Sequence, residues 1–178
     1  MNTILGANGV IAQELSRALV SFSPAIRQVS RNPRKVNPTD ETVGADLLDA
    51  QATANAVSGS KVVYLVAGLK YDTSIWQEQW PQVMRNVIDA CIHHGARLVF
   101  FDNVYAYGRV DGLMTEDTPF NPISKKGYDL TERFFQAVRD HRRGYTSEGP
   151  ERAGKDVLLG SVFPDYPKPD SPADFVSK

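Results

Sequence analysis

The stretch GANGVIA, residues 6–12, decides the fold of this chain. It follows a short β-prone run and leads into residues 10–20, where apolar side chains recur at helical spacing. In this context the G-x-x-G-x-x-A pattern predicts a phosphate-binding turn between a strand and a helix.

Gly6 permits the tight turn, Gly9 lets the backbone approach a pyrophosphate, and Ala12 lets the helix pack closely on the sheet. The amides and the dipole of the helix then favour an anion. A glycine turn that only joins a strand to a helix is the alternative. The candidate cofactor contacts on this turn are Gly6, Asn8, Gly9, Val10 and Ile11.

Strand signals alternate with helix signals along the rest of the chain. Residues 62–67 form an uninterrupted apolar run, typical of a parallel strand covered on both faces. Residues 75–94 predict the strongest helix, with Gly95 at the position of a C-terminal cap. The other expected elements are strands at 3–5, 26–30, 43–46 and 97–101 and helices at 50–57 and 125–140. The alternation predicts an α/β fold, a Rossmann-type doubly wound parallel sheet in three αβα layers, with ligands at the carboxyl ends of the strands. We expect this domain at residues 1–140 and an irregular or partly disordered segment, rich in proline, at 141–178.

The end of the second expected strand bears on the choice of cofactor. An acidic residue there binds the ribose 2′-hydroxyl of NAD, whereas an arginine accommodates the 2′-phosphate of NADP. This chain has Ser30 and Arg31 at that point, followed by Arg34 and Lys35. The pattern favours NADP over NAD, with a solvated basic loop as the alternative.

The composition narrows the class of protein. The 178 residues are 42% hydrophobic and carry a formal net charge of −1, and the basic residues form no long run, so a small-molecule partner is expected rather than nucleic acid or a membrane surface. Cys91 is the single cysteine, which excludes an internal disulfide and a multi-thiolate metal site and indicates a reducing cytoplasm. We expect no signal peptide, no membrane span and no metal.

Four motifs, in order and spacing, resemble the extended short-chain dehydrogenase/reductase family, the NAD-dependent epimerases and dehydratases. They are GANGVIA at 6–12, ADLLD at 45–49, NVIDAC at 86–91 and VYAYG at 104–108. The resemblance runs from residue 1 to about residue 127. It implies that Asp46 and Leu47 lie beside the adenine, and that Ala67 and Gly68 border the cofactor. For Asp46 the alternative is a helix-capping or turn carboxylate.

The catalytic residues that the resemblance implies are altered here. The family has a serine or threonine shortly before the Tyr-Gly motif, where this chain has Asn103, and a Tyr-x-x-x-Lys pair on the next helix. If Tyr128 is the phenol, Glu132 stands where the lysine belongs, and a carboxylate cannot lower the pKa of a phenol as an ammonium does. If instead the Tyr-Gly step of the family aligns with Lys126 and Gly127, the phenol is missing and Leu130 stands where the lysine belongs. The remaining catalytic candidates are Asn103, Tyr105 and Lys126, with strand-end packing and a solvated helix start as the alternatives for the last two.

Two functional hypotheses follow, together with a third that assigns no function. The first is an NADP-dependent oxidoreductase or epimerase acting on a sugar, an aldehyde or a ketone. The second is an NAD(P)-binding module without chemistry, a sensor or a truncated product. The third is a misassembled coding sequence of marginal stability, since the resemblance ends after residue 127 and most of the substrate lobe is missing. A truncation, a shifted reading frame and a separate family branch are all compatible with that ending. The helix at 75–94 is a candidate homodimer surface, by analogy with similar proteins.

Overall fold

The computed structural model describes residues 1–23, 25–70, 72–101, 107–114, 118 and 121. Within these ranges the chain forms five strands and three helices. In chain order they are β1 (Asn2–Leu5), α1 (Val10–Leu19), β2 (Ile26–Ser30), β3 (Glu41–Gly44), α2 (Ala50–Val57), β4 (Val62–Leu65), α3 (Thr73–His93) and β5 (Arg97–Phe100).

The five strands form one parallel sheet in the order β3-β2-β1-β4-β5. The chain moves outward from β1 through β2 to β3 and then crosses back to β4 on the other side of β1. The reversal creates a topological switch point between β1 and β4, and ligands of doubly wound sheets bind at such points, outside the carboxyl ends of the strands. The predicted Rossmann-type sheet is therefore confirmed.

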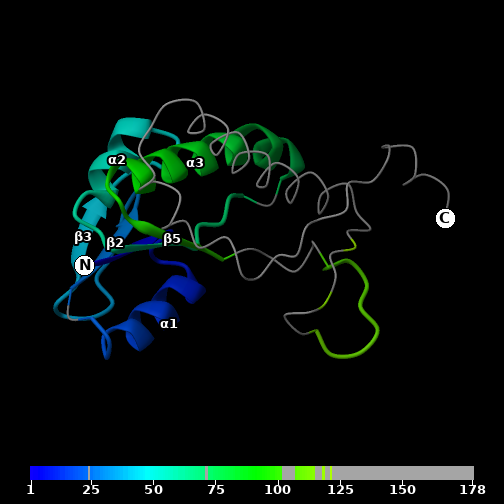
Figure 1. Cartoon of the computed structure of the whole chain (residues 1–178), viewed down its shortest axis with the longest axis horizontal. Coiled ribbons are helices and arrows are strands. Elements are labelled where there is room, and N and C mark those ends of the chain that lie inside the picture. The colour runs from blue at the N-terminus through cyan, green and yellow to red at the C-terminus, as the bar shows by residue number, and fades with distance from the viewer. Residues whose placement is uncertain (24, 71, 102–106, 115–117, 119–120, 122–178) are drawn as a thin grey trace.

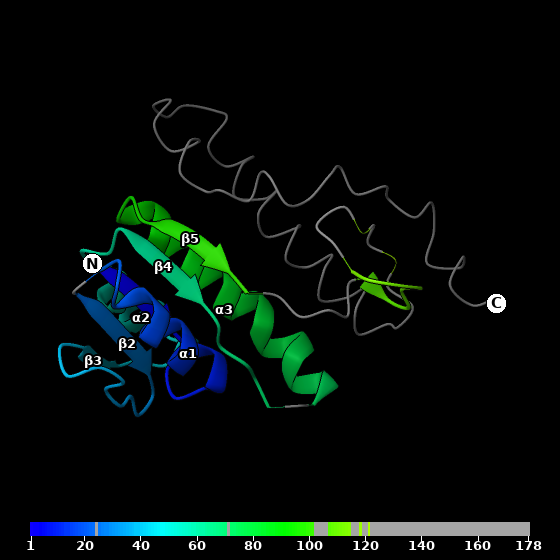
Figure 2. The same ribbon diagram turned by 90° about the horizontal axis from the view of Figure 1, so that it is seen from below.

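The helices lie in two layers, with α1 on one face of the sheet and α2 and α3 on the other (Figure 1). Seen from the α1 side, α1 lies over the middle of the sheet and β5 extends beyond it (Figure 2). Ile4 and Ile26 meet Ala12 of α1 on this face. On the opposite face the larger core joins Leu65 and Leu98 to the buried stripe of α3. The alternation of inward side chains along each strand thus builds a core on each face.

Side chains and a glycine fix the ends of the two helices on the α3 side. Asp49 caps α2 by accepting from the amide of Ala52, and Asp72 caps α3 by accepting from the amide of Ser74. Gly95 has a φ of 64° after the end of α3, as expected of a residue that terminates a helix. The predicted helix at 75–94 is confirmed, with its first residue two positions earlier.

The third strand differs from its prediction. The sequence pattern favours residues 43–46, but β3 is Glu41–Gly44. This strand lies at the edge of the sheet and three of its four residues are exposed, so no apolar pattern marks its start. The expected helix at 125–140 and the segment 141–178 lie outside the described residues. Within the described part of the chain, no helix has the combination of length and apolarity needed to cross a bilayer.

Candidate functional site

The glycine turn passes directly over the end of β4. Gly6 adopts a φ of 107°, and the amides of Gly6 and Ala7 both donate to the carbonyl of Val29 on β2, each at 2.9 Å. A Cβ added to Gly6 would lie 2.5 Å from both Cα and N of Ala67. The position therefore requires glycine for two separate reasons, its positive φ and the close backbone approach.

Gly9 is the N-cap residue of α1 and provides no side-chain hydrogen bond, and the first turn of the helix has no acidic residue. The opening amides of α1 are thus left without a side-chain cap, next to a turn whose glycines keep the approach clear. A helix start of this kind is a binding site for a phosphate or another anion.

A pocket of about 650 Å³ opens at the carboxyl ends of four strands. Its volume lies within the range of small-molecule sites, about 300–1,000 Å³. The lining residues come from the glycine turn, from the segments that follow β2, β3 and β4, and from α3. They are Gly6, Ala7, Gly9, Ser30, Arg31, Ala45, Asp46, Leu47, Leu48, Val66, Ala67, Gly68, Leu69, Lys70, Ile75, Gln79 and Val83.

Three charged residues line this pocket. Arg31 follows β2, Lys70 follows β4, and Asp46, after β3, is the one acidic residue of the lining. No described carboxylate forms an ion pair with Arg31. Oδ1 of Asp46 accepts from the amide of Leu48 at 3.1 Å and so stabilises the turn after β3. The same residue lines the pocket. The positive side chains make the pocket suited to an anionic ligand.

The segment between β3 and α2 is fastened to α3 by two amide side chains. Nδ2 of Asn86, which is buried, donates to the carbonyl of Leu47 at 2.8 Å. One turn earlier on the helix, Nε2 of the exposed Gln82 donates to the carbonyl of Leu48 at 2.7 Å. These two bonds set the position of the pocket wall that contains Asp46.

Asn8 fastens the loop between β2 and β3 to the glycine turn. It adopts a φ of 77°, and its Nδ2 donates to the carbonyl of Asn32 at 2.7 Å. Its Oδ1 accepts from the amide of Arg34 at 3.0 Å. Asn8 thus acts on the loop through its side chain and is absent from the lining of the pocket.

The structure brings most of the predicted cofactor residues together. Those that line the one pocket are Gly6, Gly9, Arg31, Asp46, Leu47, Ala67 and Gly68. Val10 and Ile11 are 78% and 44% exposed at the start of α1 and do not line it. The catalytic candidates Asn103, Tyr105 and Lys126 lie outside the described residues.

The sequence pattern did not indicate the contribution of α3 to the pocket. Ile75, Gln79 and Val83 line it from the inner side of that helix. Their spacing is the ordinary spacing of a core-facing helix, so the pattern predicts burial and carries no separate sign of a ligand. The buried amide Asn86 is the stronger signal, because a polar side chain among apolar positions requires a partner.

Comparisons with known proteins agree with this geometry. A family model described as NAD(P)H-binding matches residues 6–146. Among curated proteins the chain is similar to 3 beta-hydroxysteroid dehydrogenase type 7 of Rattus norvegicus, with 26% identity over 155 residues, covering 72% of this chain and 44% of the relative. The expected resemblance to dehydrogenases and dehydratases is confirmed at the level of the cofactor-binding domain.

Solved structures show the same fold. Uronate dehydrogenase from Agrobacterium tumefaciens has a TM-score of 0.65 at 21% identity, covering 81% of this chain and 55% of that one. A double mutant of the dTDP-glucose 4,6-dehydratase DesIV from Streptomyces venezuelae has a TM-score of 0.65 at 19% identity, covering 82% and 52%. A short-chain dehydrogenase/reductase superfamily protein from Agrobacterium tumefaciens with bound NAD has a TM-score of 0.62 at 26% identity, covering 80% and 45%. The chain spans about half the length of these proteins.

Proposed function

The chain belongs to the NAD(P)H-binding family, and on this premise we propose that it binds NADP in preference to NAD. The observation that carries the preference is the position of Arg31, which follows β2 directly and lines the pocket. No described carboxylate forms an ion pair with it. A carboxylate at this position would repel the 2′-phosphate of NADP, whereas a guanidinium binds it.

The residues present fit a dinucleotide along the whole pocket. The cradle over Gly6, which a Cβ would fill, and the uncapped start of α1 suit the pyrophosphate. Asp46 and Leu47 are proposed to border the adenine. Ala67 and Gly68, after β4, are proposed to border the nicotinamide half.

We further propose that the protein is an oxidoreductase or epimerase acting on a sugar, an aldehyde or a ketone. Bound NADP supplies the hydride acceptor or donor for such a reaction. The names of the similar proteins, a uronate dehydrogenase, a dTDP-glucose dehydratase and a hydroxysteroid dehydrogenase, support carbonyl and alcohol chemistry. Asn103, Tyr105 and Lys126 are the candidates for contact with the substrate.

A non-catalytic NAD(P)-binding module is the second candidate. The observation that favours it is Glu132, which stands four residues after Tyr128 where the resembling enzymes have a lysine. Cofactor binding without turnover on a panel of sugars, aldehydes and ketones supports the module. A reproducible change in NADPH absorbance supports an oxidoreductase, and conversion of a sugar to its epimer without a net change in absorbance supports an epimerase.

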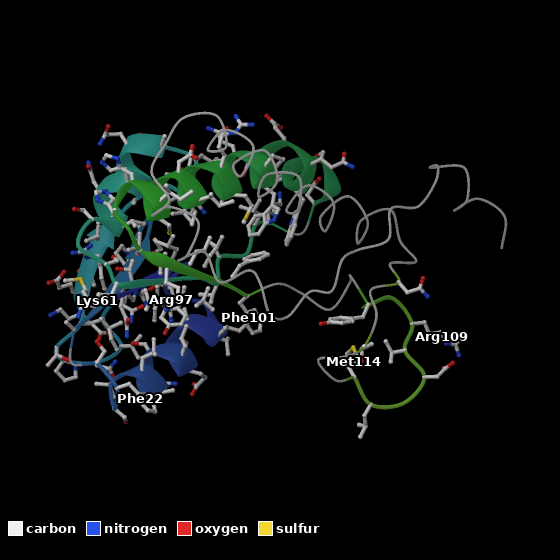
Figure 3. All side chains as sticks on the ribbon, viewed as in Figure 1. Phe22, Lys61, Arg97, Phe101, Arg109 and Met114 are labelled. Atoms are coloured by element: carbon white, nitrogen blue, oxygen red, sulfur yellow. The ribbon has the colours of Figure 1, made fainter. Side chains whose placement is uncertain are left out.

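Calorimetric titration with NADPH and NADH in parallel tests the cofactor proposal. We expect NADPH to bind more tightly than NADH. We expect Arg31→Asp to lower the affinity for NADPH by about tenfold to a hundredfold, because a charge-assisted contact is lost, and to change the affinity for NADH little. Arg97→Asp is the matched control, since Arg97 is the first residue of β5, whereas the pocket lies at the carboxyl ends of the strands. Figure 3 labels Arg97 at the start of β5 and Phe101 beyond its end. Binding of neither cofactor by the wild type contradicts the proposal.

Two finer parts of the proposal concern assembly and location. A homodimer through α3 would use a polar surface. Over residues 74–93, where the structure describes the side chains, the exposed residues are Ser74, Glu78, Gln82, Arg85, Asp89 and His93. Analytical ultracentrifugation of the purified chain decides this point. A cytoplasmic location is proposed because the single cysteine, Cys91, is a buried free thiol.

A further inference from the structure

A buried carboxylate lies at the base of the loop that joins β2 to β3. Asp40 is 1% exposed and has no ion-pair partner among the described residues. Its Oδ2 accepts from the backbone amides of Val36 at 3.1 Å and Asn37 at 3.0 Å. The same oxygen accepts from Nε2 of Gln28 at 2.9 Å and lies 3.3 Å from Oγ of Ser16.

These hydrogen bonds join the loop to two elements of the body of the fold. Ser16 belongs to α1 and Gln28 to β2, and both side chains are fully buried. The loop contributes its own amides and Nδ2 of Asn37, which donates to Oδ1 of Asp40 at 3.2 Å and to Oγ of Ser16 at 2.9 Å. Asp40 is therefore the acceptor shared by all three segments.

Burial by itself raises the pKa of Asp40, but the hydrogen bonds from Asn37, Gln28 and Val36 outweigh it and leave the pKa below the ordinary value. The side chain is thus an anion at neutral pH. The two backbone amides donate to the same oxygen, Oδ2, so the oxygen of an isosteric amide could still accept from both. The NH2 group of that amide would then face Nδ2 of Asn37, a second donor, and the bond between these two side chains would be lost.

The same loop has a second attachment beside the pocket. Asn8 binds it at the carbonyl of Asn32 and the amide of Arg34. Between β2 and the Asp40 network the chain has no helix or strand, so these two attachments set its path. The stretch that they hold contains Arg31, Arg34 and Lys35, and Arg31 lines the pocket.

We infer that Asp40 is a positioning residue for cofactor selectivity, holding the loop so that its cations meet the 2′-phosphate of NADP. This inference rests on the proposed function. Asp40 itself does not line the pocket, so it acts through the loop and touches no ligand. Because NAD lacks the 2′-phosphate, we expect displacement of the loop to weaken the binding of NADP far more than the binding of NAD.

Titration of Asp40→Asn with NADPH and NADH tests the inference. We expect NADPH affinity to fall by about tenfold, the cost of a buried hydrogen bond left unmade, with NADH affinity within about twofold of the wild type. Glu41→Gln is the matched control, because it removes a negative charge at the next residue, whose side chain is 54% exposed and pairs with Arg27. The control should keep the NADPH preference.

Each other outcome of this experiment has a definite meaning. If Asp40→Asn lowers the affinities for NADPH and NADH equally, or keeps the preference for NADPH, the inference is overturned and the proposed function stands. If the wild type itself does not prefer NADPH, the proposed function fails first and the inference with it. If Asp40→Asn does not fold, Asn37→Ala decides: it keeps the carboxylate and removes the donor side chain, and only a selective loss of NADPH affinity supports the inference.

Discussion

At the scale of single residues, Gly6 has the least room for a side chain among the glycines of the described part of the chain. Gly6→Ala introduces a positive-φ alanine and places its Cβ 2.5 Å from the backbone of Ala67. We expect a loss of about 2–5 kcal/mol in the free energy of unfolding, since strain and overpacking add. Urea denaturation measures this loss.

Gly59→Ala separates the two contributions. Gly59 has a φ of 74°, but a Cβ there meets no atom within 4 Å, so only the conformational cost of about 1 kcal/mol applies. Equal losses in the two variants would show that the close approach to the backbone of Ala67 is not what requires Gly6.

Asp40 predicts how stability depends on pH. Its pKa is lowered from 3.8 in the folded state, so its contribution to stability is complete above about pH 4 and is lost as the pH falls through the lowered pKa. We expect Asp40→Asn to be less stable than the wild type by about 2 kcal/mol at pH 7. The difference should narrow at acidic pH, which chemical denaturation at several pH values measures; a constant difference would contradict this assignment.

At the scale of elements, the attachment of α3 to the β3–α2 segment predicts a matched pair of effects. Asn86→Ala removes the shorter of the two side-chain bonds to the carbonyl of Leu47 and leaves only Oγ1 of Thr53, at 3.4 Å. We therefore expect a loss of about 1–2 kcal/mol in stability and weaker binding of NADPH and NADH alike. Gln82→Ala removes a similar bond from an exposed side chain, which water replaces. Unfolding and titration of both variants check this; equal effects would contradict the assigned role of burial.

The same scale shows how far the sequence predicts the structure. Residues 62–67 and 75–94 are predictable because their apolar patterns report burial directly, and β4 and α3 lie there. The bounds of β3 are not predictable in this way, because an exposed edge strand has no apolar pattern.

The candidate site divides in a similar way. The glycine turn is local in sequence and was predicted from its spacing. The Asp40 network joins α1, β2 and a loop, and its residues meet only in the folded chain. Ser16 was the available signal, because it is a polar residue on the inner side of an amphipathic helix.

At the scale of the whole molecule, Cys91 reports opening of the core. It is 1% exposed between α3 and the sheet, and burial raises the pKa of its thiol to about 12. We expect negligible reaction with a thiol reagent at pH 8 in the native state, and labelling that rises with urea as the chain unfolds. Because it is the single cysteine, the label counts one site. Fast, complete labelling without denaturant would mean that α3 separates from the sheet under native conditions.

The start of α1 has a consequence for the life of the protein in a cell. The carboxylates of Asp49 and Asp72 cap α2 and α3, whereas the N-cap residue of α1, Gly9, has no side chain to serve in this way. On the proposed function, the phosphates of the cofactor complete the first turn of α1, so ligand and helix are stabilised together. On the same premise we expect the first turn of α1 to open more readily without cofactor, and to be cleaved faster by proteases. The amount of the protein in a cell would then rise and fall with the concentration of the nucleotide, because only the bound form would resist proteolysis.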